Sequence, residues 1–547
     1  MYKNFFVLIL LLTLFGCSKK MNVDHIFVNG KIFTARTATE FVDAMAVKNG
    51  VIVATGTQRD ILKRYHAPDS AIIDLNDKLV VPGFHDAHLH FYGGAKLKRE
   101  VNLAGITSLD SVLKRIAEAV KHTPEGGWVI GRGWDHELWK NKKLPNRKML
   151  DRISTKHLIY LRRVDGHAAW VNTPVLKLIR YNRFTPDPPG GKIQRDRFGN
   201  PTGILFDNAF SLLDQLVPEP TETEKKMLLA RAIKEANRLG LTSITDNSPL
   251  DIYKIYHDLY NEGQLTLRVN FFVYYPDDWD STLAFLRKTG EVPRFLHAPL
   301  IKLFADGSLG SRSALLLQPY NDDPGNLGIG MHPFEELLRM VRAADEHGFQ
   351  VGVHAIGDSA VREVLDVFET LQAENPKHRR WRIEHSQVVA PSDFLRYRDL
   401  NVIASMQPSH CITDLHWAKE RIGDRARYSY AWKTFLNNNV ILAFGTDWPV
   451  EPLNPMIGLY AAVTRQDTLG YPEGGWYPEE RISMGEAIRA YTWGSAYAAG
   501  IDSWCGTLQP GRVADFVVLS EDVFTIPPRE ILNTLVVATY VGGKRVF

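Results

Sequence analysis

Short apolar runs alternate with amphipathic stretches through most of this 547-residue chain. Helix-like stretches such as 224–238, 334–347 and 358–373 lie between several of the apolar runs, an order that predicts a parallel β/α architecture. The eight predicted core strands are 79–84, 241–246, 267–275, 299–304, 349–354, 380–385, 401–406 and 440–446. Eight such strands predict a (β/α)8 TIM barrel, whose chemistry lies at the carboxyl ends of its strands.

The two ends of the chain share a different pattern, in which short β-rich runs are separated by turn residues. Between residues 22 and 81, Asn29-Gly30 and Asn49-Gly50 are hairpin signals. Residues 506–547 repeat the pattern. Because neither segment alone buries much apolar surface, we expect 22–81 and 506–547 to form one discontinuous β-sandwich domain around a barrel at 82–505.

The interval between the first two predicted barrel strands is much longer than the usual connection of two to six residues. It contains strand-like runs of its own, at 128–131 and 157–161, and a stretch rich in Pro and Gly at 186–203. We therefore expect residues 95–223 to form an inserted substrate-site subdomain at the barrel mouth, since long insertions there commonly shape a substrate pocket.

The N-terminal residues are typical of an export signal. Lys3 precedes an apolar run at 5–15 that is broken only by Thr13, and this run is too short to span a bilayer. Residues 14–17 resemble a bacterial lipobox, which predicts removal of the leader and lipidation of Cys17; a simple secretory signal cut nearby is the alternative. The expected location is a bacterial membrane, on its periplasmic or cell-surface side. The remaining cysteines, Cys411 and Cys505, are then expected to be free thiols.

Composition narrows the classes of partner. The net charge is +3, from 65 basic and 62 acidic residues, which is too nearly balanced to imply nucleic acid. A hydrophobic content of 45% is that of a globular protein. Neither a G-x-G-x-x-G after a strand nor a P-loop occurs, so nothing indicates a nucleotide enzyme.

Metal-binding residue types recur where the predicted strands end. Strand alternation places the polar residues of the fifth and eighth strands on the barrel-interior face. A single metal-binding residue type at a strand end is more often a core or capping residue. Convergence of six such residues at one barrel mouth instead predicts a metal site. The candidates are His88, His90, Lys302, His354, His385 and Asp447.

Five motifs carry a family resemblance, at 82–90, 302–312, 354–358, 384–385 and 445–449, and residues 165–167 and 203–205 in the insertion agree with them. Together they resemble the amidohydrolase superfamily, in the branch of the YtcJ-like proteins and N-substituted formamide deformylases (amidohydrolase family 3). The resemblance spans nearly all of the mature chain. His85 stands where many of these proteins have an apolar residue, and we assign it no role.

The resemblance implies a binuclear centre, most often of zinc. His88, His90 and Asp447 would hold one ion and His354 and His385 the other. Lys302, carboxylated by CO2, would bridge the two ions. The alternative is an unmodified Lys302 paired with Asp447 or Asp306 in a mononuclear site. The catalytic candidates are Asp447 and His385: a metal-bridging hydroxide would attack a carbonyl, and Asp447 would pass its proton to the leaving amine.

The residues that would contact substrate are less sharply defined. Candidates are Trp134, Asp135, His136, His167, Arg312 and His410. Asp306, Asp358 and Trp448 are candidates for supporting the metal ligands from behind.

The function expected is hydrolysis of a non-peptide C–N bond in a small-molecule amide, such as an N-acyl, N-formyl or cyclic amide. Two alternatives remain open: an esterase or phosphotriesterase that uses the same metals, and a non-catalytic, lipid-anchored solute-binding protein. The expected partners are the substrate and, through Cys17, a membrane; a homodimer is left open.

Overall fold

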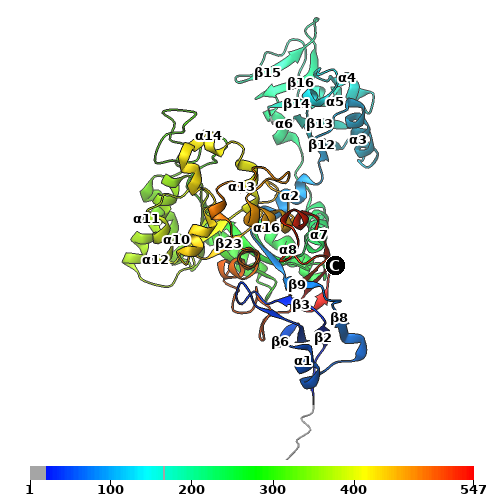
Figure 1. Ribbon diagram of the computed structural model, residues 1–547. Helices are drawn as coiled ribbons and strands as arrows, with labels where there is room; N and C mark the ends of the chain where they lie inside the picture. The colour runs from blue at the N-terminus through cyan, green and yellow to red at the C-terminus, as the bar shows by residue number, and fades with distance from the viewer. Residues whose placement is uncertain (1–19, 164–166) are drawn as a thin grey trace, which may run out of the picture. The chain divides into compact units, whose positions relative to one another are not determined.

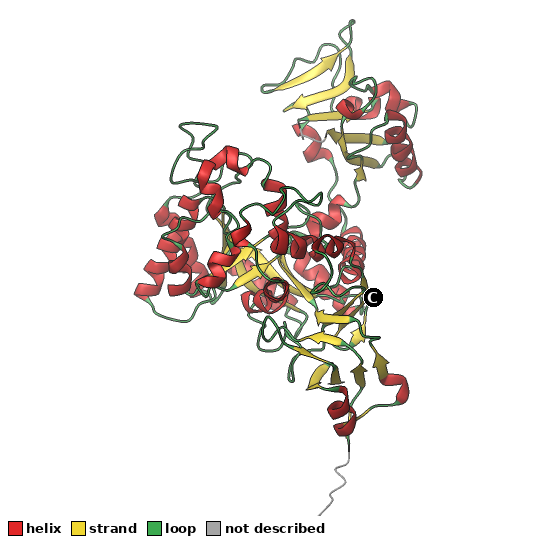
Figure 2. Ribbon diagram, viewed as in Figure 1, coloured by secondary structure: helices red, strands yellow, loops and turns green. Residues whose placement is uncertain are grey.

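The central sheet of the computed structural model contains eight parallel strands that pair in chain order, and helices surround it (Figures 1 and 2). The two end strands meet where the backbone N–H of Asp447 donates to the carbonyl of His88, at 2.8 Å. This nearly closed barrel confirms the predicted fold class. Its strands are β10 (Phe84–Leu89), β17 (Leu241–Asn247), β18 (Arg268–Tyr274), β19 (Leu296–Phe304), β20 (Gln350–Ala355), β21 (Arg382–His385), β22 (Ile403–Met406) and β23 (Leu442–Phe444).

Helices follow most of these strands. In chain order they are α8 (Asp251–Asn261), α9 (Trp279–Thr289), α10 (Phe334–Glu346), α11 (Asp358–Glu374), α12 (Phe394–Asp399), α13 (Pro408–Asp414), α14 (Ala418–Ile422), α15 (Trp432–Asn437), α16 (Pro455–Thr464) and α17 (Met484–Arg489). The described parts of the chain are residues 20–163 and 167–547, and within them no helix is both long and apolar enough to cross a bilayer. The predicted leader and Cys17 lie outside these residues.

The first barrel strand differs from its sequence prediction. Residues 79–82 form a separate strand, β9 (Leu79–Pro82), which pairs with terminal strands, and the barrel begins only with β10. Gly83 separates the two, and a Cβ there would lie 2.1 Å from Oγ1 of Thr242. One apolar run therefore serves two sheets, and the prediction merged them because hydrophobicity alone does not mark the bend.

The terminal segments form two sheets that share one hydrophobic core, as expected. The four-stranded sheet has the order β6 (Val51–Gly56), β5 (Ala44–Lys48), β2 (His25–Val28), β8 (Ile72–Asp74). The six-stranded sheet has the order β26 (Lys544–Arg545), β25 (Val536–Val541), β24 (Phe516–Leu519), β9, β3 (Lys31–Phe33), β4 (Phe41–Val42). Phe27 of the first sheet packs against Phe516 and Tyr540 of the second. We call this pair of sheets the terminal sandwich.

One of the two predicted hairpins is absent. Asn49-Gly50 does connect antiparallel neighbours, β5 and β6. Asn29-Gly30 instead carries the chain from β2 in one sheet to β3 in the other, with Asn29 at a φ of 52°. The dipeptide specifies a tight turn, but the partner of each strand is set by the packing of the core.

Contacts divide the chain into two units, which we describe separately. The first contains the barrel and the terminal sandwich, and the second comprises His90–Ala232 and Asp251–Asn261. The sheet of the second unit has the order β11 (Val101–Asn102), β12 (Trp128–Trp134), β13 (Leu158–Arg163), β14 (Ala168–Val171), β16 (Pro201–Asp207), β15 (Gly191–Arg195). Its helices include α2 (Phe91–Leu97), α3 (Leu109–Lys121), α4 (Arg147–Asp151), α5 (Thr173–Leu178), α6 (Ser211–Leu216) and most of α7 (Glu222–Arg238). The domain boundaries given from the sequence stay a prediction.

Candidate metal centre

His88 is the residue around which the site is arranged. It is fully buried near the end of β10, and its Nε2 lies 3.7 Å from Oδ1 of Asp447 and 3.5 Å from Nζ of Lys302. His90 follows the end of the strand, and ligand atoms of His88, His90 and Asp447 all lie within 4.8 Å of one another. The three residues assigned to one ion are thus brought together.

A second group of three surrounds His385. Ligand atoms of His385, His410 and Asp447 also lie within 4.8 Å of one another. His354 is in neither group, but its ring centroid is 4.5 Å from that of His385, and its Nε2 lies 3.1 Å from the carbonyl oxygen of Gly307. His410, which the sequence suggested as a substrate contact, therefore lies with candidate ligands.

Lys302 lies among these residues on β19. Its side chain is buried, with Nζ 5.0 Å from the ring centroid of Phe304. Burial lowers the pKa of Lys302 to about 8, against the opposing effect of the nearby Glu384 and Asp447 carboxylates. A buried lysine amine is unusual in a barrel interior, because its charged form loses its hydration there.

Burial favours the neutral form of three of these imidazoles, those of His88, His354 and His385. Burial, with the nearby Lys302 charge adding to it, lowers the pKa of His88 to about 4 and that of His354 to about 3. Burial and the neighbouring His354 lower the pKa of His385 well below its ordinary value. Neutral imidazole nitrogens are the form that binds Zn²⁺ or a similar cation.

Two candidate ligands have strained backbones. Asp447 has a φ of 56° and His385 a φ of 74°, and both values lie in the region that residues with a Cβ seldom adopt. β23 ends at Phe444, so a turn, and not strand alternation, aims Asp447. Asp447 thus lies beyond the strand, and the prediction that strand alternation turns it toward the barrel interior is wrong. Strain of this kind costs on the order of 1–3 kcal/mol per residue and is concentrated at functional sites.

Glu384 orients the ring of His88 through its Nδ1 atom. Its Oε2 lies 2.6 Å from Nδ1 of His88, and the same carboxylate accepts hydrogen bonds from Arg382, at 2.5 and 3.0 Å, and from Oγ of Ser405, at 2.7 Å. All four residues are fully buried. Because Arg382 and His88 hold the pKa of Glu384 far below its usual range against the effect of burial, the carboxylate stays ionised. It keeps the proton of His88 on Nδ1 and leaves Nε2 for a ligand.

Asp86 links β10, which carries His88, to the turn that carries Asp447. It accepts hydrogen bonds from the backbone N–H of His88, at 3.1 Å, and from the backbone and hydroxyl of Thr446, at 3.0 and 2.5 Å. Gly445 is required here because a Cβ would lie 2.6 Å from Oδ1 of Asp86. Asp86 thereby fixes the spacing between two candidate ligands.

Sequence reasoning gave no role to Glu384, Asp86 or Gln407, whose Oε1 lies 2.8 Å from Nδ1 of His385. Their place in the sequence could have indicated a supporting role for two of them, because Glu384 and Asp86 stand within two residues of a candidate ligand. Asp306 was considered as a support and does hold the loop after β20, accepting from Ile356 and Gly357 at 2.9 and 2.8 Å.

The remaining candidates lie in varied settings. Asp358 accepts a hydrogen bond from the N–H of Leu317, and Trp448 is buried with its N–H donating to Thr446. Arg312 pairs with Asp322 through two hydrogen bonds, at 3.2 and 2.9 Å.

The candidates in the second unit are described within that unit alone. Trp134 has no exposed surface, and its Nε1 donates to the carbonyl of Leu161, so it is a packing residue there. Asp135 forms an ion pair with Arg163 at 2.9 Å. The side chain of His167 is 77% exposed and lies 2.8 Å from Asp207. Whether any of these residues contacts a substrate stays a prediction.

The donor set suits a divalent cation. Nitrogens of neutral imidazoles and oxygens of a carboxylate are the ligands that Zn²⁺ and its neighbours prefer. His410 adds a specific sign, because its buried Nε2 has no hydrogen-bond partner among the described residues and lies 3.8 Å from Oδ2 of Asp447. Buried polar atoms are almost always paired, so this atom fits a position that a cation completes.

An eight-stranded barrel with this centre at the ends of its strands defines a metal-dependent hydrolase of the barrel class. A family model described as "Amidohydrolase family" matches residues 71–547. The chain belongs to the amidohydrolase family.

Similar proteins agree with this assignment over nearly the whole chain. The Arabidopsis thaliana protein "LONG AFTER FAR-RED 3" is 36% identical over 540 residues, covering 96% of this chain and 91% of its own. "Putative amidohydrolase YtcJ" of Bacillus subtilis is 33% identical over 532 residues, covering 95% and 99%. "N-substituted formamide deformylase" of Arthrobacter pascens is 25% identical over 537 residues, covering 95% and 97%.

Solved structures also match. An uncharacterized metal-dependent hydrolase from Pyrococcus horikoshii has a TM-score of 0.75 and 28% identity, covering 92% of this chain and 99% of its own. One from Pyrococcus furiosus matches with the same score and identity. The family resemblance and the fold class expected from the sequence are thus confirmed.

Proposed function

We propose that the protein hydrolyses a non-peptide C–N bond of a small-molecule amide: an N-acyl, N-formyl or cyclic amide. The observation that carries this proposal is the gathering of four imidazoles, one carboxylate and one buried lysine at the carboxyl end of the barrel. The name of the Arthrobacter relative, an N-substituted formamide deformylase, supports the choice of an amide carbonyl.

The proposed ligands are those named from the sequence. His88, His90 and Asp447 would hold one ion, His354 and His385 the other, and a carboxylated Lys302 would bridge them. The grouping of His410 with His385 and Asp447 makes His410 an additional candidate for the second ion. When bound, divalent ions such as zinc would polarise the carbonyl and provide a water of lowered pKa.

Asp447 is the proposed proton carrier. Its Oδ1 is 3.7 Å from Nε2 of His88 and its Oδ2 is 3.8 Å from Nε2 of His410, so the carboxylate stands between the two ligand groups. From there it would take a proton from the attacking water and pass it to the leaving nitrogen. His385, the other proposed catalytic residue, is held by Gln407 so that one ring nitrogen faces the site.

An apolar surface beside the ligands supports a substrate with an apolar substituent. The rings of Tyr274 and Phe304 stack at the ends of β18 and β19, with centroids 6.3 Å apart and planes at 12°. The ring of Phe304 is also 5.6 Å from that of His354. Tyr274 is 36% exposed, so part of this pair is accessible to solvent.

The N-terminal proposal completes this function. Residues 1–17 would direct export, and lipid on Cys17 would hold the hydrolase at a bacterial membrane. These residues lie outside the described part of the chain, so the proposal is supported by the sequence pattern alone. Mass spectrometry of the mature N-terminus would test it, and an unprocessed Met1 would overturn it.

A substrate panel tests the reaction. Metal-loaded protein is assayed against N-formyl and N-acyl amines, cyclic amides, esters and phosphotriesters. The proposal predicts turnover of at least one amide class, abolished by a chelator and restored by divalent metal. Faster turnover of esters or phosphotriesters than of any amide would overturn the C–N assignment. No turnover of any of these substrates at full metal occupancy would favour a solute-binding protein.

A further inference from the structure

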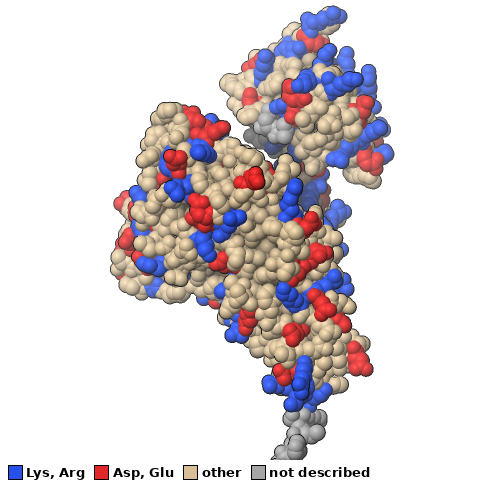
Figure 3. Space-filling model, in the orientation of Figure 1, with Lys and Arg blue, Asp and Glu red and all other residues tan. Residues whose placement is uncertain are grey.

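The near-neutral charge of the whole chain conceals a strongly basic region. Residues 90–232 contain 25 Lys and Arg against 15 Asp and Glu. Between 138 and 206 the imbalance is 15 to 4. Lys and Arg predominate on the face of this unit that Figure 3 shows. Charge asymmetry within one chain indicates an anionic partner more directly than the total charge does.

Two turns in this region have the same construction. In the first, the side chain of Asn182 accepts the N–H of Phe184 at 2.9 Å, and in the second the side chain of Asp196 accepts the N–H of Phe198 at 2.9 Å. Each turn therefore presents an Arg-Phe pair on an Asx turn. The guanidinium carbon of Arg183 lies 4.5 Å from the ring centroid of Phe184, and that of Arg197 lies 4.7 Å from that of Phe198.

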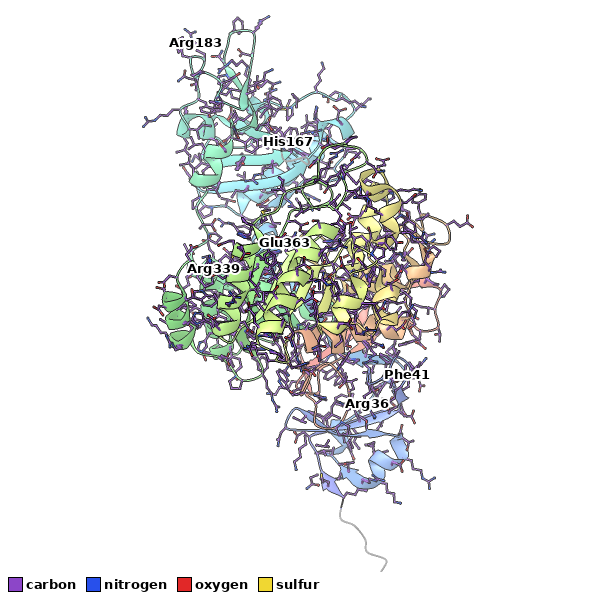
Figure 4. All side chains as sticks on the ribbon, turned by 90° about the vertical axis from the view of Figure 1, so that its left-hand side faces the viewer. Arg36, Phe41, His167, Arg183, Arg339 and Glu363 are labelled. Atoms are coloured by element: carbon purple, nitrogen blue, oxygen red, sulfur yellow. The ribbon has the colours of Figure 1, made fainter. Side chains whose placement is uncertain are left out.

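The two turns are fastened to each other. Nη1 of Arg195 donates to the carbonyl of Asn182 at 3.1 Å and to that of Gly199 at 3.4 Å. The two turns also lie close together at Gly199, because a Cβ added there would be 3.9 Å from Cβ of Arg183. The second turn joins β15 and β16, and Figure 4 shows Arg183 at one end of this unit. We call residues 182–184 and 196–198 together the Arg-Phe tip.

Both phenylalanines project into solvent. Phe184 is 78% exposed and Phe198 is 68% exposed, whereas most phenylalanines of folded proteins are buried. Leu178, just before this tip, is 45% exposed. Exposed basic residues of the surrounding surface are Lys148, Lys177, Arg180 and Lys192. Asp196 is the acid within the tip, and its carboxylate is taken up by the backbone of its own turn.

We propose that the Arg-Phe tip docks on the surface of an anionic phospholipid bilayer. The phenyl rings enter the boundary between headgroups and acyl chains, and the arginines and surrounding lysines contact lipid phosphates. Aromatic rings favour this boundary, and each basic residue near an anionic surface adds electrostatic attraction.

The shape of the tip favours a bilayer over nucleic acid. A nucleic-acid site typically tracks the strand along a groove with bases stacked on its aromatic floor. Here both rings stand at the points of turns, and an arginine already covers one side of each ring. The lipid anchor expected at Cys17 would also hold the chain beside a membrane and away from nucleic acid.

Vesicle co-sedimentation tests the proposal. The protein used lacks residues 1–19, so that neither the apolar leader nor lipid on Cys17 contributes to binding. It is mixed with vesicles of phosphatidylcholine alone or with phosphatidylglycerol added. We expect binding only when phosphatidylglycerol is present, and weaker binding as salt is raised. The double variant Phe184→Ser/Phe198→Ser should lower the apparent affinity about tenfold or more.

A matched variant distinguishes binding by this tip from nonspecific binding by other exposed apolar residues. Leu469→Ser/Tyr471→Ser changes two residues of the first unit that are 80% and 58% exposed, and it should bind as the wild type does. Unchanged melting temperatures would show that all three proteins are folded. Equal binding by the wild type and the Phe double variant, or no binding to anionic vesicles, would overturn the proposal. Binding of DNA that outcompetes the vesicles would overturn it in favour of a nucleic-acid surface.

Discussion

The barrel mouth and the core of the terminal sandwich are both rich in buried side chains, but of opposite chemistry. In the sandwich, Phe516 and Tyr540 stack with centroids 4.4 Å apart, and Phe27 meets both rings edge-on. In the mouth, His88 contacts a carboxylate, a lysine and a second imidazole. The sandwich tolerates any apolar side chain of similar volume, whereas each polar group of the mouth depends on one particular partner.

The two regions should therefore respond differently to substitution: changes in the mouth alter metal binding or turnover, and changes in the sandwich alter stability. The variants below separate these responses, beginning with the largest effect.

Asp447→Asn should remove most turnover. The amide keeps the volume and hydrogen-bonding shape of the side chain but cannot accept and return a proton, so we expect kcat to fall about 10²- to 10⁴-fold. Metal analysis of the same sample should show that ions remain bound through the histidines. A variant that retains full kcat with its metal would contradict the proton-carrier role.

Phe516→Ala should destabilise the protein without changing its metal affinity. Removing a fully buried ring from the sandwich leaves a cavity, and we expect a loss of about 3–5 kcal/mol in the free energy of unfolding, measured with urea. Leu535→Ala, at a position 67% exposed, is the control and should cost little. A drop in metal affinity equal to the drop in stability would show that the two regions are not independent.

Glu384→Gln should weaken metal binding in a folded protein. Loss of the negative charge removes the partner that holds the proton of His88 on Nδ1, and such changes lower metal affinity about 10- to 100-fold. Competition with a coloured chelator measures this without any assay of activity. Glu369→Gln, an exposed carboxylate on α11, is the matched control. Equal affinities in the two variants would argue against the orienting role of Glu384.

Cys411 and Cys505 should resist thiol reagents in the native protein. Both are buried free thiols, and burial raises the pKa of Cys411 to about 11 and that of Cys505 to about 12. Peptide mapping after alkylation at neutral pH should find label on these two positions only after unfolding. Rapid labelling of the folded chain would contradict their burial.

The same thiols predict the sign of one pH effect. Above pH about 9 the unfolded chain loses thiol protons that the folded chain still retains. Stability should therefore fall as the pH rises from about 9 toward the folded pKa values. Double replacement by Ala should flatten this part of the stability profile.

The number of barrel strands and the candidate ligands could be predicted from the sequence because each depends on a local pattern. The apolar runs mark strands, and His88, Lys302, His354 and His385 stand at or near their carboxyl ends. The family motifs then supplied the assignment of ions. The partner of each strand was harder to predict, as β9 and the Asn29-Gly30 turn show, because it depends on contacts between distant segments.

The supports of the site were missed for a related reason. Glu384 is one of many glutamates until the fold places Arg382, Ser405 and His88 around it. The Arg-Phe tip was hidden in another way, because the whole-chain charge averages a basic unit with an acidic remainder.

The central claim is that the barrel mouth is a divalent-metal centre, and the direct test is the number of ions bound per chain. Protein loaded with zinc and then freed of excess metal is analysed by mass spectrometry of its metal content, beside the variant His88→Asn/His385→Asn. The account predicts tightly held zinc in the wild type, two ions per chain if Lys302 is carboxylated, and almost complete loss from a folded double variant. A wild-type protein that holds no more zinc than the folded double variant would contradict it.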